Sequence, residues 1–154
     1  AKFVADATAL MSGGALIRPG GVTLLDTEID LSQVKSENFV VAAQTDHITT
    51  WRPCYMTSQA LGGASEVVVV NKGHIQTIVS QVANSRQKYW VGQAEVTDPD
   101  EWIRQAEQRT GSWWPHWIEW LAPRSGDEKA APERLGSLKY PAREPAPGKY
   151  VLEK

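Results

Sequence analysis

The sequence predicts an α/β fold in which a parallel sheet is flanked by helices. Residues 39–43 and 67–70 are continuous apolar runs rich in β-branched side chains, which is typical of strands buried on both faces. A segment with helical character begins at Trp51 and ends at Gly62 and Gly63, between the two runs. Strand, helix and strand in this order form a βαβ unit with an expected right-handed crossover.

The first 36 residues are expected to be rich in loops. Residues 5–10 can form the end of a helix that Gly13 and Gly14 stop, and residues 18–21 have the composition of a turn. A short strand is predicted at residues 22–25. These short elements need other parts of a chain to pack against.

A short helix is predicted after the second strand, at residues 74–79, and two longer helices follow a segment at residues 88–91 that has extended character. The first of the two longer helices begins at Asp98, where the aspartate caps the helix and proline follows it, and is expected to run to about Thr110. Ser112 is expected to cap the second helix, which extends through Leu121.

The composition changes at Pro123. Residues 123–154 hold five of the nine prolines, and we expect an extended, proline-rich tail packed on the surface of the same domain. The domain itself is predicted to comprise residues 1–122.

Charge and composition exclude several classes of function. The net charge of −2 gives no electrostatic case for binding nucleic acid, and no apolar stretch approaches the ~20 residues that span a bilayer. Cys54 is the single cysteine, so an internal disulfide is excluded, and a reducing cytosol suits the chain. Three scattered histidines and one cysteine show no metal-ligand spacing, and we expect no metal and no bound cofactor.

Asp46 and His74 each follow one of the predicted buried strands. The loops after neighbouring parallel strands leave the same edge of a sheet, and the strands lie ~4.8 Å apart. The two side chains can therefore meet, and a carboxylate that binds one imidazole nitrogen leaves the other nitrogen free to take a proton. The alternative is that Asp46 is a turn residue and His74 is incidental.

An α/β-hydrolase presents the acid and base of its triad in this way, but its nucleophile belongs on an earlier elbow between strand and helix. No Gly-x-Ser-x-Gly or Gly-x-Cys-x-Gly segment occurs here, and Ser12 lacks a preceding apolar strand. We therefore expect the C-terminal portion of an α/β-hydrolase fold, with the half that bears the nucleophile absent.

The remaining candidates receive structural roles. His47 is expected to lie beside the site and not in it, because it is adjacent to Asp46 and consecutive residues point in different directions. Trp51 is also expected beside the site, and His116 is expected to be structural because it lies in the tryptophan-rich helix. Cys54 lies in the first turn of a helix and is expected to line the core instead of acting as nucleophile.

Four tryptophans lie within residues 113–120. Packing of this helix against the sheet is the favoured interpretation, and the alternative is an amphipathic surface that meets a hydrophobic phase or a partner.

Several short segments together resemble one enzyme family. They are residues 45–48 (Thr-Asp-His-Ile), 61–63 (Leu-Gly-Gly), 73–75 (Gly-His-Ile), 98–100 (Asp-Pro-Asp), 111–115 (Gly-Ser-Trp-Trp-Pro) and 144–151 (Glu-Pro-Ala-Pro-Gly-Lys-Tyr-Val). In this order they resemble the polyhydroxyalkanoate synthases, and their residues are closer to those of the medium-chain (class II) type. Ser80 to Ala83 depart from the Asn-Pro-Pro-Gly that is usual in the family, and Thr50 replaces a proline.

The resemblance implies an acyltransferase that polymerises (R)-3-hydroxyacyl-CoA into a polyester and releases CoA. It implies that Asp46 and His74 are the acid and base of a Cys-His-Asp triad whose cysteine lies upstream of this chain. The CoA thioester is then a substrate, not a cofactor. The complete enzyme is expected to be a cytoplasmic homodimer at the polymer granule surface, and this chain alone to be inactive.

Two other interpretations stay open. The chain can be the C-terminal part of another α/β-hydrolase, such as an esterase or a depolymerase that uses the same acid and base. It can also be a non-catalytic fragment that binds granules or a partner chain through its tryptophan helix.

Overall fold

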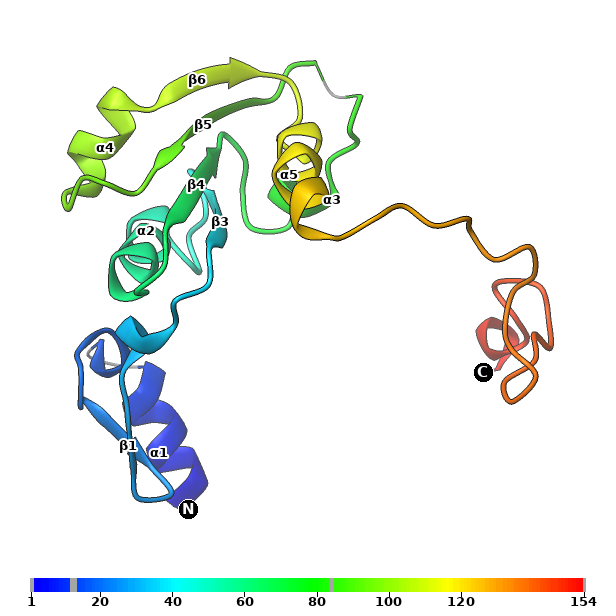
Figure 1. Cartoon of the computed structure of the whole chain (residues 1–154), viewed down its shortest axis with the longest axis horizontal. Coiled ribbons are helices and arrows are strands. Elements are labelled where there is room, and N and C mark those ends of the chain that lie inside the picture. Colours follow the sequence, from blue (N-terminus) through cyan, green and yellow to red (C-terminus); the bar gives the residue numbers. More distant parts are fainter. Residues whose placement is uncertain (1, 12–13, 84, 154) are drawn as a thin grey trace. The chain divides into compact units, whose positions relative to one another are not determined.

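A computed structural model describes residues 2–11, 14–83 and 85–153. The chain divides into two compact units, Ala1–Leu121 and Ala122–Lys154. The helices and strands of the first unit follow one another along the chain as shown in Figure 1. They are α1 (Lys2–Met11), η1 (Ala15–Ile17), β1 (Val22–Leu24), β2 (Thr27–Ile29), η2 (Leu31–Gln33), β3 (Asn38–Ala43), α2 (Trp51–Ala60), β4 (Ser65–Val70), α3 (Gln76–Val79), β5 (Lys88–Gln93), α4 (Pro99–Gln105), β6 (Glu107–Thr110) and α5 (Trp114–Leu121).

The main sheet has four strands in the order β3-β4-β5-β6, and it is mixed. Strands β3 and β4 are parallel over their full length, as the βαβ prediction required. Strand β5 is antiparallel to β4, and β6 is antiparallel to β5, so the predicted parallel pairing is found for β3 and β4 and not for the other two strands. The connection after β4 explains the reversal. Helix α3, between β4 and β5, has four residues and a rise of ~6 Å, so it does not form the crossover helix that runs back along a strand of ~20 Å in a βαβ unit.

The prediction of a helix from Asp98 to about Thr110 is only half right. The Asp98 side chain accepts a hydrogen bond from the Asp100 N–H and caps α4 as expected. Helix α4 nevertheless ends at Gln105, and residues 107–110 form the edge strand β6. A four-residue polar strand has no apolar alternation that distinguishes it from the end of a helix.

Helices cover both faces of the sheet. Trp51 and Tyr55 of α2 and Trp102 of α4 pack on Val67 and Val69 of β4. The opposite face is formed by alternate residues of the same strand and is covered by α5. The cluster there consists of Val68, Val70, Tyr89, Val91 and Trp113, with Phe39, Val41, Trp114 and Trp117 against it. The predicted packing of the tryptophan helix on the sheet is therefore confirmed.

Close backbone contacts explain the glycine pair after α2. A Cβ atom at Gly62 would lie 1.8 Å from the Ser32 carbonyl oxygen, and one at Gly63 would lie 1.9 Å from that of Ser36. No side chain fits at either position. The two glycines let the turn after α2 pass against the segment that leads into β3.

The second unit holds little regular structure. It contains the 3-10 turns η3 (Ala122–Arg124) and η4 (Tyr150–Leu152) and an isolated bridge between Gly136 and Pro141. Its large apolar side chains are exposed, with Leu135 at 88% and Leu138 at 106%. Whether this tail packs on residues 1–122 stays a prediction.

Candidate functional site

The parallel pair β3 and β4 positions Asp46 and His74. Beyond the strands, the two loops continue the ladder, since the Gln44 N–H donates to the Val70 carbonyl (2.8 Å) and the Thr45 N–H to that of Lys72 (3.2 Å). The loops therefore leave the sheet edge together. This brings Oδ2 of Asp46 to 2.7 Å from Nδ1 of His74.

Asp46 is held by four hydrogen bonds. The backbone N–H groups of Ile48 (2.8 Å) and Thr49 (3.0 Å) donate to Oδ1, and the Thr49 hydroxyl (2.9 Å) and His74 donate to Oδ2. Burial alone would raise the pKa of this carboxyl, but the hydrogen bonds from His74, Ile48 and Thr49 outweigh it. The pKa of Asp46 is held well below its usual range, so the group is a carboxylate.

Thr49 is the one site residue that the sequence interpretation missed. Its backbone and its hydroxyl both bind the carboxylate, and the hydroxyl lies 3.5 Å from Nδ1 of His74. An aspartate followed three positions later by threonine is a pattern for local side-chain to backbone bonding, and it could have indicated this residue.

His74 presents its other nitrogen to solvent. Since Asp46 accepts from Nδ1, this nitrogen carries a proton, and the lone pair of the neutral ring is on Nε2. None of the described residues binds Nε2, and the side chain is 44% exposed. The imidazole is thus oriented by a buried carboxylate and open on its opposite side, which is the arrangement of a general base.

The glycine before His74 is not required by the backbone. A Cβ atom at Gly73 would meet only the Thr45 hydroxyl, at 3.8 Å, which is ordinary contact, and its φ lies outside the left-handed region. The turn into His74 therefore does not depend on a glycine at this position.

The two residues predicted to lie beside the site differ in burial. His47 is exposed. Trp51 is 5% exposed and packs in the cluster under α2, with Arg52 stacked 4.8 Å from its ring. Trp51 therefore supports the helix that follows the Asp46 loop.

The Cys54 thiol has the surroundings of a structural cysteine. It is half-buried, and its Sγ lies 3.8 Å from the Thr49 carbonyl oxygen. Burial and the nearby charge of Asp46 raise the pKa of the thiol. A reactive cysteine requires a lowered pKa, so the site gives Cys54 no activation as a nucleophile.

His116 is held at both ring nitrogens, unlike His74. Arg109 lies 2.9 Å from Nδ1, and Nε2 contacts the Glu66 carboxylate. An arginine can only donate, so Nδ1 accepts and Nε2 carries the proton. A histidine with both nitrogens engaged in this way links α5 to the sheet and fits the predicted structural role.

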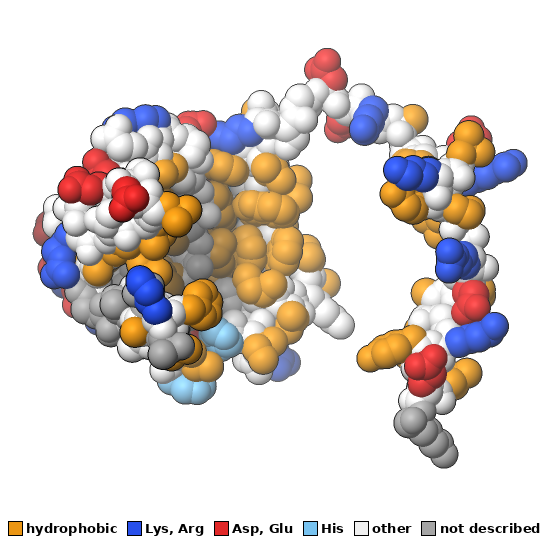
Figure 2. Space-filling model, turned by 90° about the horizontal axis from the view of Figure 1, so that it is seen from below, with side chains coloured by type: hydrophobic (Ala, Val, Ile, Leu, Met, Phe, Trp, Pro, Cys, Tyr) orange, Lys and Arg blue, Asp and Glu red, His pale blue; other side chains and the backbone are white. Residues whose placement is uncertain are grey.

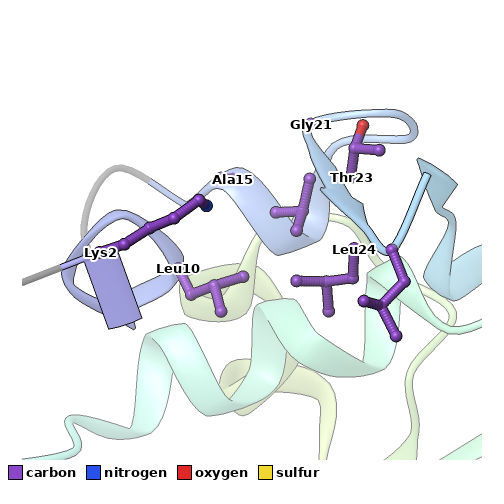
Figure 3. Close-up of a pocket in the computed structure, with 8 residues that line it drawn as sticks. Lys2, Leu10, Ala15, Gly21, Thr23 and Leu24 are labelled. Carbon is purple, nitrogen blue, oxygen red and sulfur yellow. The ribbon is translucent and has the colours of Figure 1, made fainter. Parts of the chain in front are cut away.

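Two pockets formed by described residues do not include Asp46 or His74. A pocket of about 380 Å³ lies between α1, η1 and β1 (Figure 3). A larger apolar pocket of about 560 Å³ is formed by α1, η1 and α2, with Leu16, Pro53 and Met56 among its lining residues. Neither includes a residue that was predicted to act in catalysis, and Ser12 lies outside the described residues.

Exposed apolar side chains occur in the two loops that carry Asp46 and His74. Ile48 (65%), between Asp46 and Thr49 in the sequence, and Ile75 (67%), next to His74, are exposed, and so is Val79 (67%) at the end of α3. Figure 2 shows histidine side chains at the surface next to hydrophobic ones. The described residues hold no group of three or more metal-binding side chains, and none of their helices is long and apolar enough to cross a membrane.

Comparisons with known proteins identify relatives of the whole chain. It is 38% identical over all 154 residues to poly(3-hydroxyalkanoate) polymerase 1 of Ectopseudomonas oleovorans, of which it covers 28%. Over 89% of the chain it is 42% identical to polymerase 2 of the same organism, covering 24% of that protein. Over 88% of the chain it is 33% identical to the polymerase subunit PhaC of Cupriavidus necator, covering 23% of it. No family model matches the chain.

The chain therefore spans about a quarter of the length of these curated relatives. Its Asp46 and His74 both fall within the matched stretch of the first of them, which includes every residue of the chain.

Proposed function

Since this chain belongs to the polyhydroxyalkanoate synthase family, we propose that Asp46 and His74 are the acid and base of a Cys-His-Asp triad in a polyester-forming acyltransferase. One observation carries this proposal. A buried carboxylate binds Nδ1 of an exposed imidazole whose Nε2 is open, at the carboxyl edge of two parallel strands. The chain is, on this proposal, the C-terminal portion of an α/β-hydrolase fold.

The nucleophile of the proposed triad is a cysteine outside this chain, because Cys54 has a raised pKa and donates to a backbone carbonyl. Nε2 of His74 takes the proton of that cysteine, and the thiolate attacks the thioester carbonyl of a 3-hydroxyacyl-CoA. The carbon–sulfur bond to CoA breaks, and the CoA thiolate takes the proton back from His74. The acyl group is then a thioester on the enzyme.

Chain growth requires a second deprotonation, at the 3-hydroxyl group that attacks the enzyme-bound thioester. Asp46 is poorly suited to that role, because its two oxygens already accept four hydrogen bonds and it is 7% exposed. His74 is therefore assigned as the base in both half-reactions, and Asp46 orients it and stabilises its protonated form.

The resemblance of residues 45–48 to the medium-chain (class II) type supports a medium-chain substrate, and the chain is more similar to the two Ectopseudomonas oleovorans polymerases, at 38% and 42% identity, than to the Cupriavidus necator subunit, at 33%. Exposed Ile48 and Ile75 beside the site give an acyl side chain apolar surface to contact. The polymer granule in the cytoplasm and a homodimer are the proposed setting of the complete enzyme.

The proposal is tested in the complete synthase that contains this sequence, by CoA release from 3-hydroxydecanoyl-CoA and by polymer yield. We expect His74→Ala to lower the rate by at least ~10³-fold and Asp46→Asn by about 10³- to 10⁴-fold. His47→Gln is the matched control, because this adjacent histidine is exposed. Near-normal polymer yield from either site variant refutes the assignment, and release of free hydroxy acid without polymer favours an esterase or depolymerase.

A further inference from the structure

We propose that Trp113 is a positioning residue that holds His74 against Asp46; the inference rests on the proposed role of His74 as base. Nε1 of Trp113 donates a hydrogen bond to the Thr77 carbonyl oxygen at 2.8 Å. Both partners are buried, Trp113 at 4% and Thr77 at 3% exposed. A hydrogen bond that is shielded from water in this way constrains the segment that it joins.

Thr77 transmits this constraint to the residue before the histidine. Its backbone N–H and its hydroxyl both donate to the Gly73 carbonyl oxygen, at 3.1 and 3.0 Å. The peptide that leads into His74 is thus bonded to Thr77, and Thr77 is bonded to Trp113. No further hydrogen bond of the His74 ring apart from those to Asp46 and Thr49 is found among the described residues.

Helix α3 needs such help from outside. It has four residues, and an isolated single turn is not stable in water. The last carbonyl groups of a helix also lack partners within the helix. Indole N–H groups supply them here, since Trp113 binds the Thr77 carbonyl and Trp114 binds that of Ile78 at 3.2 Å. Figure 1 shows α3 and α5 next to each other.

Helix α5 is in turn fixed to the sheet that carries Asp46. The Trp113 ring packs on Phe39 of β3, with centroids 6.4 Å apart, and His116 joins α5 to Glu66 of β4. Asp46 follows β3 directly. Trp113 therefore ties the His74 segment to the same strands that hold its carboxylate partner, and it does so without touching the open face of the imidazole.

Trp113→Phe tests the inference in the complete synthase, because it removes the N–H donor and keeps an aromatic ring. Trp117→Phe is the matched control, since Trp117 packs in the same cluster. The rate of CoA release from 3-hydroxydecanoyl-CoA gives kcat and KM, and thermal unfolding gives the melting temperature. We expect Trp113→Phe to lower kcat about tenfold and to leave KM within about twofold. We expect Trp117→Phe to lower the melting temperature as much as Trp113→Phe does but to leave kcat nearly unchanged.

Thr77→Val tests the same chain of hydrogen bonds at a second point. It removes the bond from the Thr77 hydroxyl to the Gly73 carbonyl and keeps the shape of the side chain. In a double-mutant cycle, we expect the effects of Trp113→Phe and Thr77→Val on kcat to be less than additive. Equal losses of kcat in the Trp113 and Trp117 variants, or additive effects in the cycle, overturn the positioning role. A His74→Ala enzyme that retains activity would instead refute the proposed function.

Discussion

At the scale of single residues, the carboxylate of Asp46 couples the stability of the fold to pH. Its pKa is lowered in the folded state, so the folded protein binds fewer protons than the unfolded chain at acidic pH. The resulting stabilisation is fully present above the ordinary carboxyl pKa of about 4 and is lost as the pH falls toward the lower folded value.

Asp46→Asn should therefore remove this dependence. We expect the difference in urea midpoint between the native protein and this variant to be largest at pH 7 and to shrink between pH 4 and pH 3. Urea unfolding at these three pH values measures it. A difference in urea midpoint that stays constant from pH 7 to pH 3 would show that the Asp46 carboxylate does not stabilise the folded state through its lowered pKa.

The thiol of Cys54 gives a second prediction at this scale. Its raised pKa keeps it protonated at neutral pH, so it should react slowly with iodoacetamide, and Cys54→Ala should leave CoA release by the complete synthase within about twofold of normal. Mass spectrometry of the alkylated protein and the CoA assay measure the two effects. Rapid modification of Cys54 together with loss of turnover in the alanine variant would restore it as a nucleophile.

The sequence predicted that Asp46 and His74 meet, because each lies in the loop after a run of apolar β-branched residues, and strand ends determine where such side chains lie. It did not identify Thr49 or Trp113 in the same way, although the spacing of three positions between Asp46 and Thr49 offered a local signal for Thr49. Both act through hydrogen bonds to a neighbouring segment, Thr49 to Asp46 and Trp113 to Thr77, and residue type alone does not reveal that partner.

At the scale of elements, glycines that look alike in the sequence have different roles. A Cβ atom at Gly63 would collide with the Ser36 carbonyl, whereas one at Gly73 fits without a clash. We predict that Gly63→Ala lowers the free energy of unfolding by ~1–3 kcal/mol and that Gly73→Ala changes it by less than ~0.5 kcal/mol. Chemical unfolding of both variants compares them directly, and equal effects would contradict the close backbone approach.

Element direction is harder to predict than element type. Strands β3 and β4 and helix α2 were predicted from their own residues, and so was the Asp98 cap of α4. The antiparallel direction of β5 depends instead on the course of the connection between β4 and β5, in which α3 is a single turn, and β6 is a strand because β5 offers it an edge to pair with. The direction of β5 and the strand conformation of β6 therefore cannot be predicted from the residues of those strands alone.

At the scale of the whole molecule, the second unit has apolar side chains that it does not cover by itself. They are Leu135, Leu138, Tyr140, Tyr150 and Leu152. Burying a leucine side chain contributes ~1.5–3 kcal/mol, so a segment with this composition gains stability by packing on another surface. We predict that this surface belongs to the catalytic domain of the same protein.

Deletion of residues 123–154 from the complete synthase should then lower its melting temperature, because apolar surface would be exposed on both sides of the lost contact. Replacing Leu135 and Leu138 together by glutamine should reproduce much of that loss, since it removes the apolar contacts and keeps the chain. Glu128→Gln, at an exposed position of the same segment, is the control and should have no effect. Unchanged melting after the deletion would mean that the tail does not stabilise this domain, and its apolar side chains would then be free to contact a partner chain or a granule.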